Sequence, residues 1–246
     1  MLISEIDPRG LIAKSLSEHS QIQVYDTEAL SRLKTRTRIF ESGSYVFREG
    51  LSFSDYVFVI SGYLFRQKQT SDGYRQIVAL IIPGDIANPE NRFVNNLDYN
   101  VVCAEKSNIA YVQKSEFESL IDSYPSIRLA MDLRTTAESR QLREWLLNIG
   151  GRSAKTRVAH FLNEFAARTK LRGLSDGLHF SLPMSQEQIG DSVGITPVHV
   201  NRAIRSLVES GLISHTNRKY EIVDIDGFRQ AGQFSERFLS ARNLPQ

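Results

Sequence analysis

Residues 198–205 carry side chains whose types and spacing suit the recognition of base pairs. On a helix that turns about 100° per residue, Val198, Arg202 and Arg205 share one face, and Asn201 lies at its edge. Arginine can form two hydrogen bonds with guanine, asparagine can do the same with adenine, and an apolar side chain suits the methyl group of thymine. The opposite face is apolar, so the pattern predicts an amphipathic helix in which Arg202 and Asn201 read base edges and Val198 makes an apolar contact.

Cap and turn signals place this helix second in a pair. Ser185 and Gln188 have capping-box spacing, so a first helix is expected directly after Ser185. Gly194 should end that helix, because glycine tolerates positive φ. Thr196 then stands at a cap position before a proline that suits the first helical turn, and Gly211 is expected to end the second helix. Two short helices joined by a tight turn predict a helix-turn-helix.

A basic turn follows the helix pair. It lies between short apolar runs at 212–213 and 220–223, a pattern typical of a two-stranded wing. A wing and the free N–H groups of a helix start both suit phosphate oxygens. We therefore expect five side chains mainly to contact the DNA backbone: Thr196, His199, Arg205, Arg218 and Lys219.

Charge and composition narrow the class of protein. The net charge is +2, with −2 on residues 1–150 and +4 on residues 151–246, so the excess of cations lies in the part that holds the helix pair. No apolar stretch approaches the roughly 20 residues needed to cross a bilayer, and the N-terminus lacks the features of a signal peptide. The single cysteine, Cys103, cannot form an intrachain disulfide. We expect a cytoplasmic protein without membrane contact.

Short strand-like runs fill the chain before residue 113. They lie at 38–40, 45–47, 56–60, 63–65, 76–82, 100–104 and 109–112. Glycines at 50, 62, 73 and 84 punctuate these runs at intervals of 11 or 12 residues, and Asp72-Gly73 is a hairpin signal. This spacing of short strands and turns predicts an antiparallel roll or sandwich.

After residue 112, the spacing of the apolar residues changes from that of strands to that of helices. The helices expected there must connect the two parts of the chain. Ser115 and Glu118 suggest a capped short helix at 115–121, and Pro125 suits the first turn of a longer helix that runs to about Asn148, with Gly150-Gly151 as its stop. The long helix has apolar side chains on more than one face, so it can cover its own domain and pack against a partner. We expect an α+β fold with a sensor domain at 1–122, a dimerisation helix and hinge at 123–150, and a DNA-binding domain at 151–246.

The block 182–213 resembles the Crp/Fnr superfamily of transcription regulators. The most specific segments are PMSQE at 183–187 and VHVNR at 198–202, with looser similarity at 72–77 and 83–85. The segment 143–150 resembles a branch of the family with no commonly assigned effector. The resemblance implies a cyclic-nucleotide-binding-like β-roll, a long dimerisation helix and a C-terminal winged helix-turn-helix. It also implies a homodimer that binds double-stranded DNA at an inverted repeat and contacts RNA polymerase.

The β-roll departs from the cyclic-nucleotide binders of that family. Those members follow a Gly-Glu pair with an arginine that neutralises the cyclic phosphate, whereas here Gly84-Asp85 is followed by Asp98 at about the position of the arginine. Arg92 is an alternative arginine that could reach the site. One cysteine cannot hold the iron–sulfur cluster of the family's oxygen sensors, and the roll lacks histidines for haem or a metal. We expect no cofactor and leave the effector, if there is one, unidentified.

The second helix also departs from the family. Its first residues are Pro197-Val198, where readers of the best-known half-site carry a pair that contains glutamate, so the operator should differ from that consensus. The leading hypothesis is a homodimeric DNA-binding transcription regulator whose roll either senses a small molecule or serves as a scaffold. The alternative is a ligand-binding module that works mainly through protein contacts. An enzyme is not expected, because convincing carboxylate pairs and a nucleophile motif are missing from the sequence.

Overall fold

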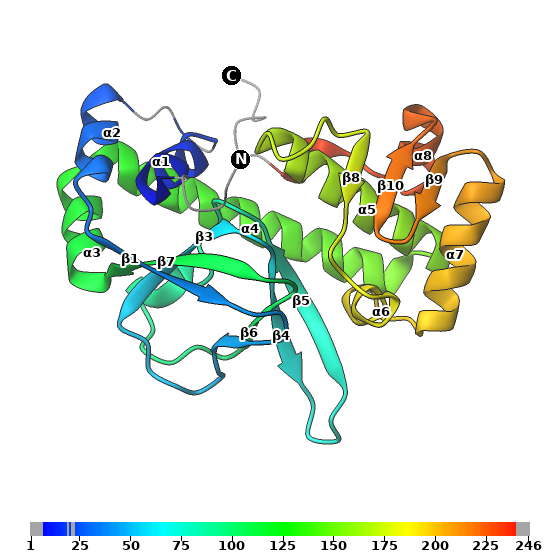
Figure 1. Ribbon diagram of the computed structural model, residues 1–246, viewed down its shortest axis with the longest axis horizontal. Helices are drawn as coiled ribbons and strands as arrows, with labels where there is room; N and C mark the ends of the chain where they lie inside the picture. The colour runs from blue at the N-terminus through cyan, green and yellow to red at the C-terminus, as the bar shows by residue number, and fades with distance from the viewer. Residues whose placement is uncertain (1–6, 19, 21–22, 240–246) are drawn as a thin grey trace. The chain divides into compact units, whose positions relative to one another are not determined.

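The computed structural model describes residues 7–18, 20 and 23–239, and these residues form two compact units. The β-roll unit comprises the described residues up to 72 together with 78–138. The winged-helix unit comprises 73–77 and 139–239. The mixture of helices and antiparallel sheets confirms the predicted α+β class (Figure 1). Within the described ranges, no helix has both the length and the apolar character needed to span a membrane.

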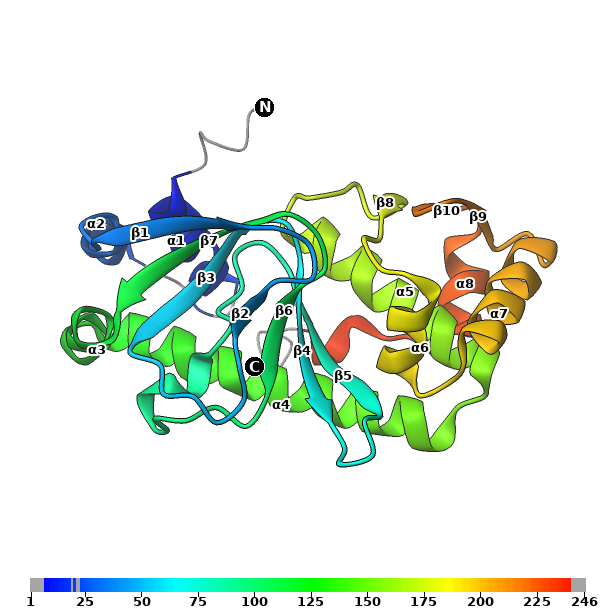
Figure 2. The same ribbon diagram turned by 60° about the horizontal axis from the view of Figure 1, so that its bottom comes forward.

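Seven strands form the roll, and each overlaps one of the predicted runs. They are β1 (Thr35–Phe40), β2 (Tyr45–Phe47), β3 (Asp55–Ser61), β4 (Leu64–Gln69), β5 (Arg75–Ile81), β6 (Asn100–Cys103) and β7 (Ser107–Gln113). They form two sheets with the strand orders β1-β7-β3 and β2-β6-β4-β5 (Figure 2). The pairs β1–β7, β3–β7, β2–β6 and β4–β6 are antiparallel, as the spacing of turn residues predicted.

Strand β3 lies between the interior of the roll and the helices that cover it. Successive side chains of a strand point to opposite faces. Val57 and Val59 accordingly belong to the cluster inside the roll. Tyr56, Phe58 and Ile60 belong to a second cluster, which the helices complete. Both faces of β3 are therefore buried, and the strand holds the helices to the roll.

The helices that cover this face are α1 (Pro8–Ser17), α2 (Val24–Ser31), α3 (Lys114–Ser123) and the start of α4 (Pro125–Gly151). A short 3₁₀ turn, η2 (Pro89–Arg92), lies in the loop between β5 and β6. The predicted cap at Ser115 is wrong, because α3 begins as soon as β7 ends and Ser115 lies inside the helix. Gln113 holds the cap position, and its side chain makes no capping hydrogen bond within the described residues.

Helix α4 begins at Pro125, as predicted, but it includes both glycines and ends at Gly151, beyond the predicted end near Asn148. The division of the chain into the two compact units falls within this helix, between Glu138 and Ser139, rather than at the glycine pair. A hinge at the glycine pair therefore stays a prediction. Beyond Glu138, the helix is anchored within the winged-helix unit by the indole of Trp145, whose Nε1–H donates to Glu164 Oε2 at 2.8 Å.

The winged-helix unit is built around α5 (Ala154–Leu171). It also contains α6 (Gln186–Val193), α7 (Pro197–Glu209), α8 (Ile225–Ala231), the 3₁₀ turn η3 (Glu236–Phe238) and a sheet with the order β8-β10-β9. The strands are β8 (His179–Ser181), β9 (Ile213–Thr216) and β10 (Lys219–Ile222). The sequence predicted the hairpin of β9 and β10 but not β8, which has three residues. Strand β8 completes the sheet behind the wing.

Candidate nucleic-acid interface

The start and end of α6 follow the predicted signals. Ser185 Oγ accepts a hydrogen bond from the Gln188 amide at 3.1 Å, and Gln188 Oε1 accepts one from the Ser185 amide at 2.8 Å. Gly194 ends the helix with φ of 67°, a left-handed conformation that suits glycine. This local geometry turns the chain directly into α7, which packs against α6 within the same unit (Figure 1).

Two residues that set the α6–α7 turn were missed in the sequence. A Cβ atom on Gly190 would lie 2.4 Å from the carbonyl oxygen of Ile195, so this glycine allows the turn to approach the helix. A glycine in the interior of a helix was the available signal. Arg157 of α5 donates from Nη1 to the carbonyl oxygens of Val193 and Gly194, both at 3.3 Å. Its cation satisfies acceptors at the C-terminus of α6, where a positive charge is favourable.

Helix α7 has the two faces that its sequence predicted. Val200 and Leu207 are fully buried. On the other face, the Val198 residue is 59% exposed, and Arg202 and Arg205 are exposed as well. Neither guanidinium forms a hydrogen bond or an ion pair with the described part of the chain. An arginine readily pairs with a carboxylate that lies nearby. Arg202 and Arg205 have no such partner among the described residues, and the apolar side chain of Val198 is exposed beside them.

Three other predicted residues have partners at the start of α7. Thr196 occupies the cap position, but its hydroxyl forms a hydrogen bond with His199 Nδ1 at 2.8 Å and no capping bond within the described residues. The predicted capping role of this hydroxyl is therefore wrong. Asn201 donates from Nδ2 to Gln186 Oε1 at 3.2 Å. Gln186 was missed as a member of this surface, and it orients the Asn201 amide.

The wing forms as predicted. Lys219 pairs with Thr216 across the antiparallel hairpin, and Asn217 adopts a positive φ of 58° in the turn. Arg218 and Lys219 are exposed at this turn. Behind them, the Tyr220 ring stacks on Phe180 of β8, with ring centroids 5.3 Å apart and planes 9° apart. The basic turn therefore projects from a hairpin that is anchored by packed rings.

Comparison with known proteins decides the family. Residues 156–231 match the Crp-like helix-turn-helix domain, and residues 37–124 match the cyclic nucleotide-binding domain. The chain belongs to the Crp/Fnr family. As a member of that family, it is a DNA-binding transcription regulator, with the effector-type domain and the helix-turn-helix domain in the expected order.

Relatives of this Crp/Fnr regulator span most of its length. The transcriptional activator protein anr of Pseudomonas aeruginosa is 25% identical over 203 residues, which cover 82% of this chain and 83% of that protein. The nitrogen fixation regulation protein FixK of Bradyrhizobium diazoefficiens is 29% identical over 186 residues, 75% of this chain and 77% of that protein. The structure of FixK2 from Bradyrhizobium japonicum has the same fold, with a TM-score of 0.74, 24% identity, and coverage of 81% of this chain and 98% of that one.

In the nucleotide-binding-like domain of this Crp/Fnr regulator, the charged residues near the cassette have partners that the sequence did not predict. The cassette is the segment 84–98, which resembles the phosphate-binding segment of the cyclic-nucleotide binders. Asp98 pairs with Lys68 at 2.8 Å, and this hydrogen bond lowers the pKa of Asp98. Arg92 pairs with Asp122 of α3 at 2.7 Å, so it does not supply an arginine to the cassette. Arg66 of β4 does reach the cassette, and it donates from Nε to the Ala87 carbonyl at 3.0 Å. Among the described residues, no group of three or more metal-ligating side chains gathers at a metal-binding spacing.

Proposed function

We propose that the regulator acts as a homodimer that reads an inverted-repeat operator, with one α7 in each of two successive major grooves. The observation that carries this proposal is the exposed face of α7, where Arg202 and Arg205 lack partners in the described chain beside the exposed Val198. An arginine near the start of such a helix suits bidentate recognition of guanine. Grooves on one side of DNA repeat roughly every 34 Å, which sets the expected spacing of the half-sites.

The long helix supports a second copy of the chain as the partner. Four leucines of α4 are more than half exposed: Leu129 at 51%, Leu142 at 54%, Leu146 at 73% and Leu147 at 52%. Apolar side chains on a helix are stabilised when another helix removes them from water. A pair of α4 helices would bury these side chains and join two DNA-binding units.

The residues of α7 and the wing divide into two roles. Arg202 and Asn201 contact base edges, and Asn201 exchanges its hydrogen bond with Gln186 for one with a base. Val198 makes an apolar contact with a thymine methyl. The remaining predicted residues position the phosphate backbone without reading sequence: Thr196, His199, Arg205, Arg218 and Lys219.

The regulatory output is transcription in the cytoplasm through contact with RNA polymerase. Support comes from the relatives named transcriptional activators in Pseudomonas aeruginosa and Cereibacter sphaeroides. The β-roll unit either gates this output with a small molecule or holds the dimer without one.

The decisive experiment selects duplexes from a random DNA pool with the purified full-length protein, without added ligand, near physiological salt. We expect an inverted repeat to be enriched. Arg202→Ala should weaken binding to that site by ~1–3 kcal/mol and relax the preference at one position of each half-site. Arg205→Ala is the matched control, because the same substitution on the same helix should weaken all sequences alike.

If Arg202→Ala kept both the preferred sequence and the affinity, Arg202 would not read a base, and this assignment would be wrong. If the protein enriched no sequence, two readings would remain. Either an effector must first align the two α7 helices, or the alternative of a module that works through protein contacts holds.

A further inference from the structure

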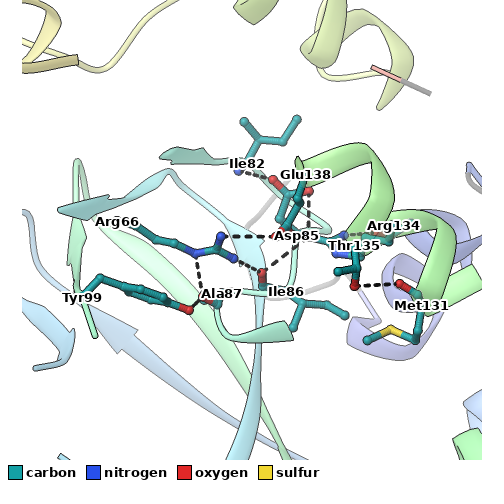
Figure 3. Close-up of polar contacts among 11 residues, drawn as sticks. Arg66, Ile82, Asp85, Ile86, Ala87, Tyr99, Met131, Arg134, Thr135 and Glu138 are labelled. Carbon is teal, nitrogen blue, oxygen red and sulfur yellow. Dashed lines mark hydrogen bonds and ion pairs between the residues drawn. The ribbon is translucent and has the colours of Figure 1, made fainter. Parts of the chain in front are cut away.

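Four charged side chains meet where α4 crosses the segment 84–87 of the β-roll unit (Figure 3). Arg66 comes from β4, Asp85 from the cassette, and Arg134 and Glu138 from α4. Their side chains are 12%, 8%, 4% and 26% exposed, respectively. Desolvated charges are unfavourable unless they are paired, so this cluster must hold itself together by its own contacts.

Arg66 fixes the backbone that follows Asp85. Its Nε donates to the Ala87 carbonyl at 3.0 Å, and its Nη2 donates to the Ile86 carbonyl at 3.2 Å. Its third contact runs from Nη1 to Glu138 Oε2 at 3.3 Å. The Tyr99 ring lies 5.2 Å from the guanidinium carbon, and the Tyr99 hydroxyl also donates to the Ala87 carbonyl at 3.2 Å. Arg66 therefore links the cassette to α4 (Figure 3).

Arg134 contacts the same carboxylate from the other side. Its Nη2 donates to Glu138 Oε1 at 3.2 Å and lies 3.6 Å from Asp85 Oδ1. Its Nη1 donates to the hydroxyl of Ser15 in α1 at 3.3 Å. Asp85 is held in turn, because its Oδ2 accepts a hydrogen bond from the Ile82 amide at 3.0 Å. The Arg134 Nε is buried and has no hydrogen-bond partner among the described residues.

Glu138 is thus the carboxylate that both arginines share, with one oxygen for each. The two cations face Asp85 and Glu138, and the charge of Glu90 also acts on Arg66. Glu138 is the carboxylate that contacts both cations, so its loss would leave them undercompensated. Burial by itself would lower the pKa of Arg66, but the nearby charge of Glu138 raises it instead. In cyclic-nucleotide-binding members of the family, the anion that meets a cassette arginine comes from the ligand. Here it comes from the chain.

We propose that Glu138 is an internal anion, which fills the position between Arg66 and Arg134 and holds α4 on the β-roll without an anionic effector. The β-roll unit is then complete in its ligand-free form. This role of Glu138 bears on the regulation of the proposed function, but it can be tested without DNA. It also predicts a latent site: without the Glu138 carboxylate, the two arginines should accept a small anion such as acetate or inorganic phosphate.

The test measures thermal unfolding of the full-length protein in sodium chloride, sodium acetate and sodium phosphate at equal ionic strength. Glu138→Ala should lower the melting temperature in chloride, on the order of 5 °C. Acetate or phosphate should restore at least half of that loss. The wild type should show no shift that is specific to either anion, and cyclic AMP should not stabilise it.

Two further variants control the result. Asp132→Ala removes an exposed carboxylate from the same helix, and it should leave both the melting temperature and its response to anions unchanged. Glu138→Ala combined with Arg134→Met should lose the rescue, because one of the two cations is gone. If acetate restored this double variant equally well, the anion would act elsewhere and the proposal would fail.

An unchanged melting temperature for Glu138→Ala would overturn the proposal. Clear stabilisation of the wild type by cyclic AMP would overturn it as well. Failure of the DNA selection would leave a positive rescue result standing. Conversely, failure of the rescue would leave the assignment of α7 to DNA untouched.

Discussion

The arginines of α7 and the arginines beneath α4 have the same side chain and opposite surroundings. Arg202 and Arg205 are exposed and have no partner in the described part of the chain. Arg66 and Arg134 are 12% and 4% exposed, and both bind Glu138 and backbone carbonyls. The first pair is accessible to solvent and therefore to a DNA phosphate or base. The second pair is largely withdrawn from solvent and depends on its internal partners.

Burial, rather than residue type, therefore separates a cation that is free to bind from one that holds the fold. An exposed arginine costs little to leave unpaired, because water satisfies its five N–H groups. A buried arginine without a partner is strongly unfavourable, and removing one member of a buried pair leaves the other uncompensated. The same substitution should therefore reduce stability strongly in the buried pair and hardly at all in the exposed pair.

Arg134→Met tests the buried pair directly. This change removes a buried cation but keeps an apolar chain of similar length, and it leaves Asp85 without its cationic neighbour. The free energy of unfolding should fall by about 3 kcal/mol, measured by urea denaturation with circular dichroism. Arg202→Met is the matched control and should change stability by less than about 0.5 kcal/mol. Equal losses in the two variants would show that burial does not separate the roles of these arginines.

The buried residue His160 tests whether burial also controls a titratable side chain inside the winged-helix unit. His160 is 1% exposed, and its Nδ1 makes a 3.0 Å hydrogen bond with the Gly232 carbonyl. Burial, together with the cation of Arg152, lowers the pKa of His160 to about 4. An unfolded histidine has a pKa of about 6.5, so between these values the unfolded state binds more protons. His160 should therefore destabilise the fold as the pH falls from about 6.5 towards 4, by roughly 3 kcal/mol in total.

The measurement compares the free energy of unfolding of the wild type and His160→Asn between pH 7 and pH 4. Asparagine keeps an N–H donor for Gly232 but does not titrate, so the variant should lose less stability across this range. Burial raises the pKa of Glu164, one turn further along α5, and its contribution to stability is lost as the pH rises. Because Glu164 is present in both proteins, the difference between them isolates His160. Parallel curves for the two proteins would exclude this role.

Much of the DNA-binding site could be predicted from the sequence, because short-range signals determine its helix ends and turns. The capping box at Ser185, the left-handed Gly194 and the proline at the start of α7 each act within a few residues, so their geometry can be derived without the rest of the fold. The exposed face of α7 follows from its period alone. The hydrogen-bond partners at the start of α7 do not follow from the period. The Thr196 hydroxyl could bond either to the backbone or to His199, and in the folded helix it bonds to His199.

The ionic cluster was not predicted, because its members come from distant parts of the chain. Arg66 lies in the run LFRQKQ, where it looks like an exposed strand residue. Its contacts with Ile86, Ala87 and Glu138 span 20, 21 and 72 residues of sequence. Arg92 was the nearer candidate in sequence, but α3 places Asp122 beside it. Only the tertiary packing of β4, the cassette and α4 identifies the arginine that is buried.

The smallest expected effect concerns Lys219, the wing residue that should act by charge alone. An exposed lysine that neutralises one phosphate releases about one counterion, so Lys219→Ala should weaken binding to all DNA sequences alike and reduce the slope of log affinity against log salt by about 1. The slope is measured by titration of a labelled duplex at several salt concentrations. Lys106→Ala is the control, because Lys106 is exposed in the β-roll unit and pairs with Glu41. If Lys219→Ala altered the preferred sequence while the slope stayed constant, the wing would read bases, and the division between reading by α7 and positioning by the wing would be wrong.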